Sequence, residues 1–312
     1  MVKPATLIRQ YKQYSSDFRT WDQRSHAQNW LLFERNVGAT LSIDEVSLSN
    51  GELWTFLTNK AGKGRKGTLV AAIRGTRITD IKRVLQNIPE RLRMRVKEVS
   101  MDMAKNMETA VTAVFTNAKI VTDRFHVIQL VQRCLQEVRI GLWKQEIERE
   151  AQLMEQARNT GIKYDPEKLL NEDTPRQLLA RCRYPLMKYE SQINDVNQEF
   201  RLRIAFYRYP ELHRAYKHAQ KLRDIYLDKN GDYAEQKLDS WVATTFKYGH
   251  ETFESAANSI KWHKNNILNF FDNRTTNASA ESFNARIKLF RANQKGVRDT
   301  TFFLFRLCKL YA

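Results

Sequence analysis

Residues 38–60 read GATLSIDEVSLSNGELWTFLTNK, two β-rich runs separated by the small polar segment Ser-Asn-Gly at 49–51. Such a segment between two β-rich runs is typical of a β-hairpin. A third β-rich run, GTLVAAIRG at 67–75, follows the glycine- and lysine-rich turn AGKGRKG at 61–67. The sequence therefore predicts a three-stranded antiparallel meander.

Helical and extended patterns alternate after the meander. Apolar side chains recur near a 3.6-residue period in 77–92 and 104–117, which predicts two helices. A short extended run follows each helix, RVKEVSMDM at 95–103 and AKIVTD at 118–123. Three strands followed by helix, strand, helix and strand form a mixed sheet with covered faces, so we expect an α/β fold.

Long amphipathic helical patterns replace the extended runs from about residue 124 to residue 270. This change predicts an all-α insertion into the α/β core. The expected organisation is a short N-terminal extension (1–38), the first part of the core (39–125), the helical insertion (126–269), and a final core segment (270–312) that carries a helix.

The chain is strongly basic. Its 52 Lys and Arg against 35 Asp and Glu give a formal net charge of +17. A solvated basic surface is one explanation, but a surplus of this size favours nucleic acid, because each neutralised phosphate releases counterions. No apolar run approaches the roughly 18 residues of a membrane span, and no signal segment is evident, so we expect a soluble, intracellular protein without a membrane partner.

The three cysteines are Cys134, Cys182 and Cys308, and they lie far apart in the sequence. They form no C-x-x-C pair, so neither a zinc site nor a disulfide framework is indicated.

Three acidic residues occupy unusual positions in the predicted elements. Asp44 lies inside a β-rich run, where an acid costs free energy unless it has a partner or a function. Asp102 lies at the end of the fourth predicted strand, and Glu281 lies in the first turn of the late helix. A turn or surface role explains each acid singly. Together they could hold the two divalent cations used in phosphoryl transfer to DNA, because hard cations prefer carboxylate oxygens.

Four segments carry a family resemblance: S-I-D-E-V, S-M-D-M, V-T-D-R-F-H-V and the late T-T-N-A-S-A-E-S-F-N-A-R-I-K-L-F-R. The chain resembles DDE-type transposases of bacterial insertion sequences over about residues 38–312. Specifically, it is similar to the group whose RNase H-like core is interrupted by a long helical insertion before the glutamate. The resemblance implies an enzyme that uses two Mg²⁺ or Mn²⁺ ions to cut and rejoin double-stranded DNA. It also implies that Asp44, Asp102 and Glu281 are the catalytic metal ligands.

Asp123 and His126 match a D-x-x-H signature of related transposases. This pair could be structural, or it could contact DNA or handle a proton. In a competing assignment Asp123, not Asp102, is the second metal ligand. We prefer Asp102, because the RNase H-like order places that acid on strand four. Asn284 shares a helix face with Glu281 and is expected to orient the site.

Basic residues near the expected site are candidates for binding the DNA backbone, with a solvated basic surface as the alternative. They lie in the turn between the second and third strands and on the late helix. The candidates are Lys60, Lys63, Arg65, Lys66, Arg286, Lys288 and Arg291.

Other partners and functions follow from the same resemblance. We expect a homodimer or larger assembly on DNA, associated with the nucleoid in the bacterial cytoplasm. Only 38 residues precede the core, so either a separate DNA-binding polypeptide recognises the element ends or the chain is a truncated or inactive remnant. The alternatives to transposition are an RNase H-like nuclease or resolvase without strand transfer, and a domesticated, non-catalytic DNA-binding protein.

Overall fold

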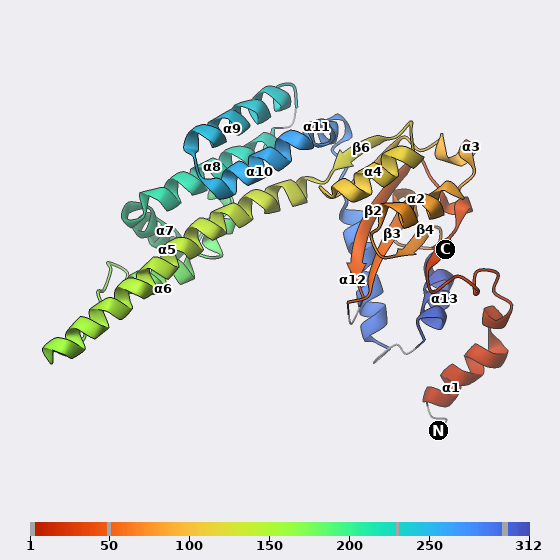
Figure 1. Ribbon diagram of the computed structural model, residues 1–312, viewed down its shortest axis with the longest axis horizontal. Helices are drawn as coiled ribbons and strands as arrows, with labels where there is room; N and C mark the ends of the chain where they lie inside the picture. Colours follow the sequence, from red (N-terminus) through yellow and green to blue (C-terminus); the bar gives the residue numbers. More distant parts are fainter. Residues whose placement is uncertain (1–3, 49–50, 229–230, 295–298) are drawn as a thin grey trace. The chain divides into compact units, whose positions relative to one another are not determined.

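A computed structural model of the chain describes residues 4–48, 51–228, 231–294 and 299–312 (Figure 1). Ser49 and Asn50 of the expected hairpin turn lie outside these residues. The chain divides into two compact units. We call Met1–Asp123 together with Asn265–Ala312 the sheet unit, and Arg124–Lys264 the helical unit.

The sheet unit contains a six-stranded sheet in the order β1-β4-β3-β2-β5-β6. The pairs from β1 to β2 in this order are antiparallel, and β2, β5 and β6 are parallel. The predicted α/β fold, a mixed sheet with a large helical region, is confirmed. The strands are β1 (Trp30–Leu32), β2 (Thr40–Ser47), β3 (Leu53–Asn59), β4 (Leu69–Arg74), β5 (Glu98–Met101) and β6 (Lys119–Thr122).

Successive side chains of a strand point to opposite faces of the sheet, and apolar side chains point to both faces here. Helices therefore cover both faces. Ile43 and Val99 belong to the core under α2 and α4, whereas Val46 and Phe56 belong to the core under α12 and α13. The α12 face is the one that matters for the site. The helices of this unit after the meander are α2 (Ile78–Gln86), α3 (Glu90–Arg93), α4 (Lys105–Val114), α11 (Lys264–Asn273), α12 (Ala278–Ala292) and α13 (Thr300–Tyr311).

The segment before residue 39, expected to be a short N-terminal extension, contributes directly to the sheet unit. It contains α1 (Pro4–Gln10), but it also supplies β1, which pairs with β4 at the edge of the sheet. The Phe18 ring packs edge-on against Phe302 and Phe305 of α13, at centroid distances of 5.1 and 5.3 Å. Burial of these rings ties the segment to the core.

The helical unit begins with α5, a single helix of 37 residues from Arg124 to Thr160. In its core the His218 ring stacks on Trp241 at 4.7 Å, and burial lowers the pKa of His218 to about 4, so this histidine is a neutral core residue. None of the described helices combines the length and apolar composition needed to cross a membrane. The later helices are α6 (Pro175–Arg181), α7 (Val196–Arg208), α8 (Pro210–Leu227), α9 (Ala234–Tyr248) and α10 (Glu251–Trp262).

The cysteines lie in both units. Cys134 and Cys182 in the helical unit and Cys308 in the sheet unit are buried, free thiols. Burial raises the pKa of Cys134 and of Cys182 to about 12, so both are protonated at neutral pH and act as small apolar core residues.

Candidate active site

Three aspartates lie on the same face of the sheet, either within or directly after three neighbouring parallel strands. Ser42 of β2 lies beside Ser100 of β5, which lies beside Val121 of β6. Side chains two residues apart on a strand point to the same face, so the next residue on this face of each strand is acidic. These residues are Asp44, Asp102 and Asp123.

Asp44 is held by α12. The side-chain amide of Asn284 donates to Asp44 Oδ2 over 2.7 Å, and the Glu45 backbone N–H donates to Asp44 Oδ1 over 2.8 Å. Asn284 is buried, and it lies on the helix one turn after Glu281. The amide of Asn284 therefore connects α12 to one of the strand carboxylates.

Asp102 has a different environment. Its Oδ1 is buried and has no hydrogen-bond partner among the described residues. Burial raises the pKa of the neighbouring Glu45 carboxyl, and the charges of Asp102 and Asp44 raise it further. Carboxylates that repel one another in a partly desolvated place, one with an oxygen that accepts no hydrogen bond, fit a divalent cation well, because such ions take carboxylate ligands.

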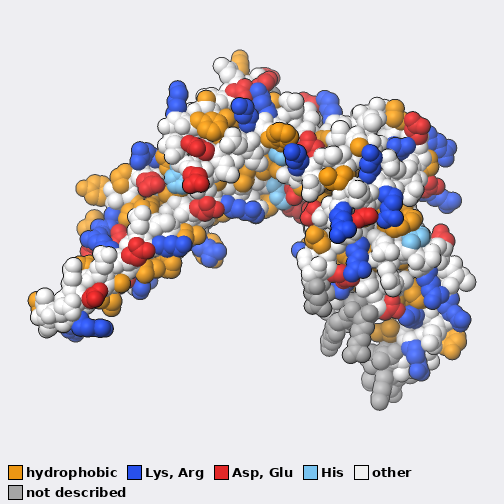
Figure 2. All heavy atoms as spheres, viewed as in Figure 1, with side chains coloured by type: hydrophobic (Ala, Val, Ile, Leu, Met, Phe, Trp, Pro, Cys, Tyr) orange, Lys and Arg blue, Asp and Glu red, His pale blue; other side chains and the backbone are white. Residues whose placement is uncertain are grey.

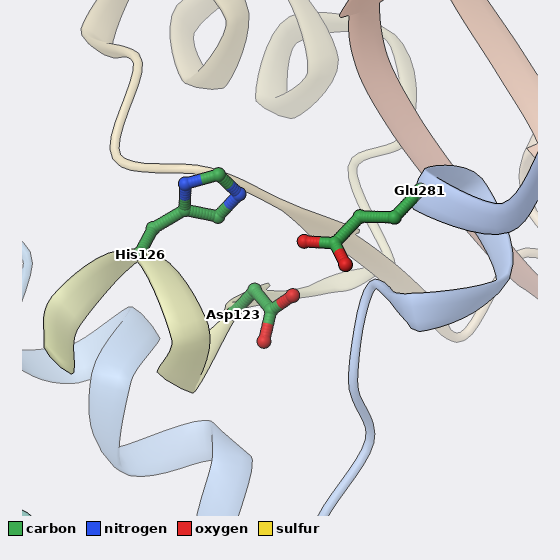
Figure 3. A group of neighbouring side chains, drawn as sticks. All are labelled: Asp123, His126 and Glu281. Carbon is green, nitrogen blue, oxygen red and sulfur yellow. The ribbon is translucent and has the colours of Figure 1, made fainter. Parts of the chain in front are cut away.

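Asp123 and Glu281 lie close together, although they belong to distant segments of the sequence. Asp123 and Glu281 each offer one carboxylate oxygen, and these atoms lie within 4.8 Å of each other. His126, drawn with them in Figure 3, belongs to the helical unit. Asp123 and Glu281 belong to the sheet unit, so their proximity is a property of its fold. Among the described residues, neither Asp44 nor Asp102 has a carboxylate oxygen within 4.8 Å of the ligand atoms of both Asp123 and Glu281.

The glycine-rich turn and α12 are joined by a hydrogen bond. Arg286 Nη1 donates to the Gly64 carbonyl over 2.6 Å. Gly64 has a φ of +70°, and a Cβ atom there would lie 2.5 Å from Arg286 Nη1, so this position requires glycine. The bond brings the turn, with its exposed Lys63, Arg65 and Lys66, beside the exposed Arg286 of α12. Lys288 is also exposed on α12.

Two of the basic candidates are instead engaged in internal ion pairs. Lys60 Nζ lies 3.1 Å from Glu98, and Arg291 Nη2 lies 3.0 Å from Glu52. The Lys60 and Arg291 side chains are only 13% and 10% exposed. Burial lowers the pKa of the Lys60 ammonium, and Glu98 partly offsets that effect. These geometries favour a structural role for both residues over binding of a DNA phosphate.

Replacement of Lys60 by methionine is expected to lower the free energy of unfolding by about 3 kcal/mol, because it leaves the buried Glu98 charge without its cation. Chemical denaturation measures this change. Lys63→Met is the matched control: Lys63 is exposed, so its unfolding free energy should change by less than about 0.5 kcal/mol. A Lys60→Met protein of unchanged stability would contradict the structural assignment.

Several polar residues near the carboxylates were not among the residues predicted from the sequence. Asn277 occupies the N-cap position of α12, but its side chain does not cap the helix. Instead, Asn277 Oδ1 accepts from Ser100 Oγ over 2.9 Å. The available signal was weak: two serines, Ser42 and Ser100, in strands whose other inward residues are mostly apolar.

Residues 41–307 match the family model of the ISL3 group of DDE transposases, which is described as "Transposase". The chain belongs to this transposase family. The match contains all three acidic candidates, Asp44, Asp102 and Glu281, and it extends across both units. No curated protein and no solved structure matches the chain.

Membership of the family makes the chain a transposase of an insertion sequence, which is a mobile DNA element. The family implies DNA as the substrate and the use of a divalent metal ion. The predicted DDE-type resemblance is therefore confirmed.

Proposed function

We propose that this transposase cleaves DNA strands and joins them to new DNA, with two Mg²⁺ or Mn²⁺ ions held by Asp44, Asp102 and Glu281. The observation that carries the proposal is that two of these acids lie on one face of the sheet, next to the helix that bears the third. Asp44 and Asp102 share one face of adjacent strands, and Asn284 connects Asp44 to the helix that bears Glu281.

The proposed chemistry has two steps at phosphorus. In the first, a water oxygen attacks a phosphodiester at the element end; the bond from phosphorus to the 3′ oxygen breaks, and a free 3′-hydroxyl results. In the second, this hydroxyl loses its proton, attacks a target phosphodiester, and displaces the target's own 3′ oxygen. Two bound divalent cations would activate the attacking oxygen and stabilise the leaving one. Asn284 would keep the Asp44 carboxylate oriented during both steps.

The charge distribution supports DNA binding by the sheet unit. It carries 28 of the 52 Lys and Arg residues but only 15 of the 35 Asp and Glu residues. Figure 2 shows Lys and Arg side chains spread over the visible surface, with acidic side chains between them. We infer that the exposed turn and helix residues Lys63, Arg65, Lys66 and Lys288 contact the DNA backbone, and that Arg286 holds the turn in place.

Simultaneous replacement of Lys63, Arg65 and Lys66 by alanine is expected to weaken DNA binding and to make it less sensitive to salt. If each side chain neutralises one phosphate, the slope of log K against log salt should become smaller by about 2.7. Fluorescence anisotropy with a labelled duplex at several salt concentrations measures both effects. The Lys82/Arg83 double alanine variant on α2 is the control, because these exposed residues belong to another surface. An equal change in slope in the control would refute the assignment.

A strand-transfer assay tests the proposed function. Duplexes that carry the inverted repeats flanking the reading frame are incubated with the protein, Mg²⁺ and a supercoiled plasmid. Transposition predicts nicked ends and joined products. Cleavage without joined products would identify a nuclease or resolvase, and retention without cleavage would identify a non-catalytic DNA-binding protein.

Assembly and location remain part of the proposal. We propose that two or more copies act together on DNA in the bacterial cytoplasm, in association with the nucleoid, and that a separate polypeptide contributes to recognition of the element ends. Sedimentation of the protein with and without end duplexes, and with the product of a neighbouring reading frame, measures these associations.

A further inference from the structure

We propose that Ser100 and Asn277 are positioning residues that fix α12, and with it Glu281, against the strands that carry the aspartates. Ser42 and Ser100 are fully buried in the sheet, with their hydroxyl oxygens 2.9 Å apart. The Ser100 hydroxyl donates to Asn277 Oδ1, so the Ser42 hydroxyl supplies the proton between the two serines. This inference rests on the proposed metal-dependent function.

Asn277 connects this chain of hydrogen bonds to a carboxylate. Its backbone N–H donates to Asp123 Oδ2 over 3.1 Å, and its carbonyl accepts from the backbone N–H of Glu281 over 3.1 Å. Asn277 is fully buried. One residue therefore bonds to Ser100 of β5, to the acid after β6 and to the first turn of α12.

A second bond attaches the same segment to β5. Thr275 Oγ1 donates to Glu98 Oε2 over 3.1 Å, and the same carboxylate pairs with Lys60. Glu98, Ser100 and Asp102 are alternate residues and lie on one face. Thr275 and Asn277, also two residues apart, thus bond to successive positions on that face, and Asp102 is the next position.

The buried polar side chains of Ser42, Ser100 and Asn277 cost free energy relative to apolar ones, and a structural role alone does not explain this cost. Buried parallel strands are usually apolar, and a buried hydroxyl must find a hydrogen-bond partner. In addition, the Asn277 side chain does not cap its own helix, although such a cap commonly stabilises a helix. The gain lies in geometry: α12 is fixed at Asn277 and again at Asn284, and Glu281 lies between these two attachments.

The experiment measures Mn²⁺ binding directly, by the electron paramagnetic resonance signal of free Mn²⁺, on the full chain without DNA. Ser100→Ala and Asn277→Ala are expected to weaken Mn²⁺ binding about 10- to 100-fold, the range typical of residues that orient metal ligands. Ser100→Thr keeps the hydroxyl and should restore binding to within about threefold. Asn36→Ala, which removes a different side-chain amide bonded to the backbone carbonyl of Leu69, should leave Mn²⁺ binding unchanged.

The outcomes separate this inference from the proposed function. Equal Mn²⁺ affinity in wild type, Ser100→Ala and Asn277→Ala, with only the thermal midpoint lowered, would mean that the two residues are merely structural and would overturn the inference alone. A Ser100→Thr variant as weak as Ser100→Ala would also overturn it, because the hydroxyl would then not be the cause. A wild-type chain that binds no Mn²⁺ would overturn both the inference and the metal-dependent function.

Discussion

Replacement of Asp44 by asparagine, or of Glu281 by glutamine, is expected to lower the rate of metal-dependent DNA strand cleavage about 1,000-fold or more. Each change removes a negative ligand of the proposed cations but keeps the shape of the side chain. Asparagine at position 44 can still accept the hydrogen bond from Asn284, so the fold should survive. The rate of nicking of an end-labelled duplex at saturating Mg²⁺ measures the effect.

DNA binding should separate from cleavage in these variants. Neither Asp44 nor Glu281 belongs to the proposed basic surface, so duplex affinity should stay within about threefold of wild type. Glu90→Gln is the control, since Glu90 is an exposed acid on α3 and its replacement should leave cleavage unchanged. Wild-type cleavage by Asp44→Asn or Glu281→Gln would refute the catalytic assignment.

Asp102 and Asp123 should respond very differently to the same isosteric change. Asp102→Asn is expected to lower cleavage about 1,000-fold or more and to remove most Mn²⁺ binding, because Asp102 Oδ1 accepts no hydrogen bond from the described residues. Asp123 Oδ2 instead accepts from the Asn277 N–H. Asp123→Asn should therefore have the smaller effect of a residue that supports the site, about 10- to 100-fold.

The competing assignment has support of its own, since Asp123 is the acid whose ligand oxygen lies within 4.8 Å of that of Glu281. Parallel measurement of cleavage and Mn²⁺ affinity in the two variants decides between them. A larger loss in Asp123→Asn than in Asp102→Asn would show that Asp123 is the second metal ligand and that Asp102 is secondary.

The order of the elements and the mixed character of the sheet could be predicted from the sequence, because the hairpin segment and the alternation of helices and strands are strong local signals. Which strands pair could not be predicted, because β2 and β5 pair over a large separation in the sequence. That pairing is what brings Asp44 and Asp102 to the same face, although 58 positions separate them in the sequence. The short strand β1 was missed because three residues are too few to show a period.

The features of the site that could not be predicted depend on contacts between segments far apart in the sequence. Lys60 and Arg291 are basic, like residues that bind DNA phosphates. Only their ion pairs with Glu98 and Glu52 favour a structural role instead. Asn277 at the start of a helix is most simply interpreted as a cap, and its bond to Ser100, 177 positions away, has no local signature. Side-chain partners far apart in one sequence leave no pattern from which they could be inferred.

Anomalous X-ray scattering from crystals of the protein soaked in Mn²⁺ shows which carboxylates hold the cations. We expect Mn²⁺ peaks bound by carboxylate oxygens of Asp44 and Asp102, with Glu281 as a further ligand. Peaks that avoid Asp44 and Asp102 at saturating Mn²⁺, or the absence of any peak on this face of the sheet, would contradict this expectation.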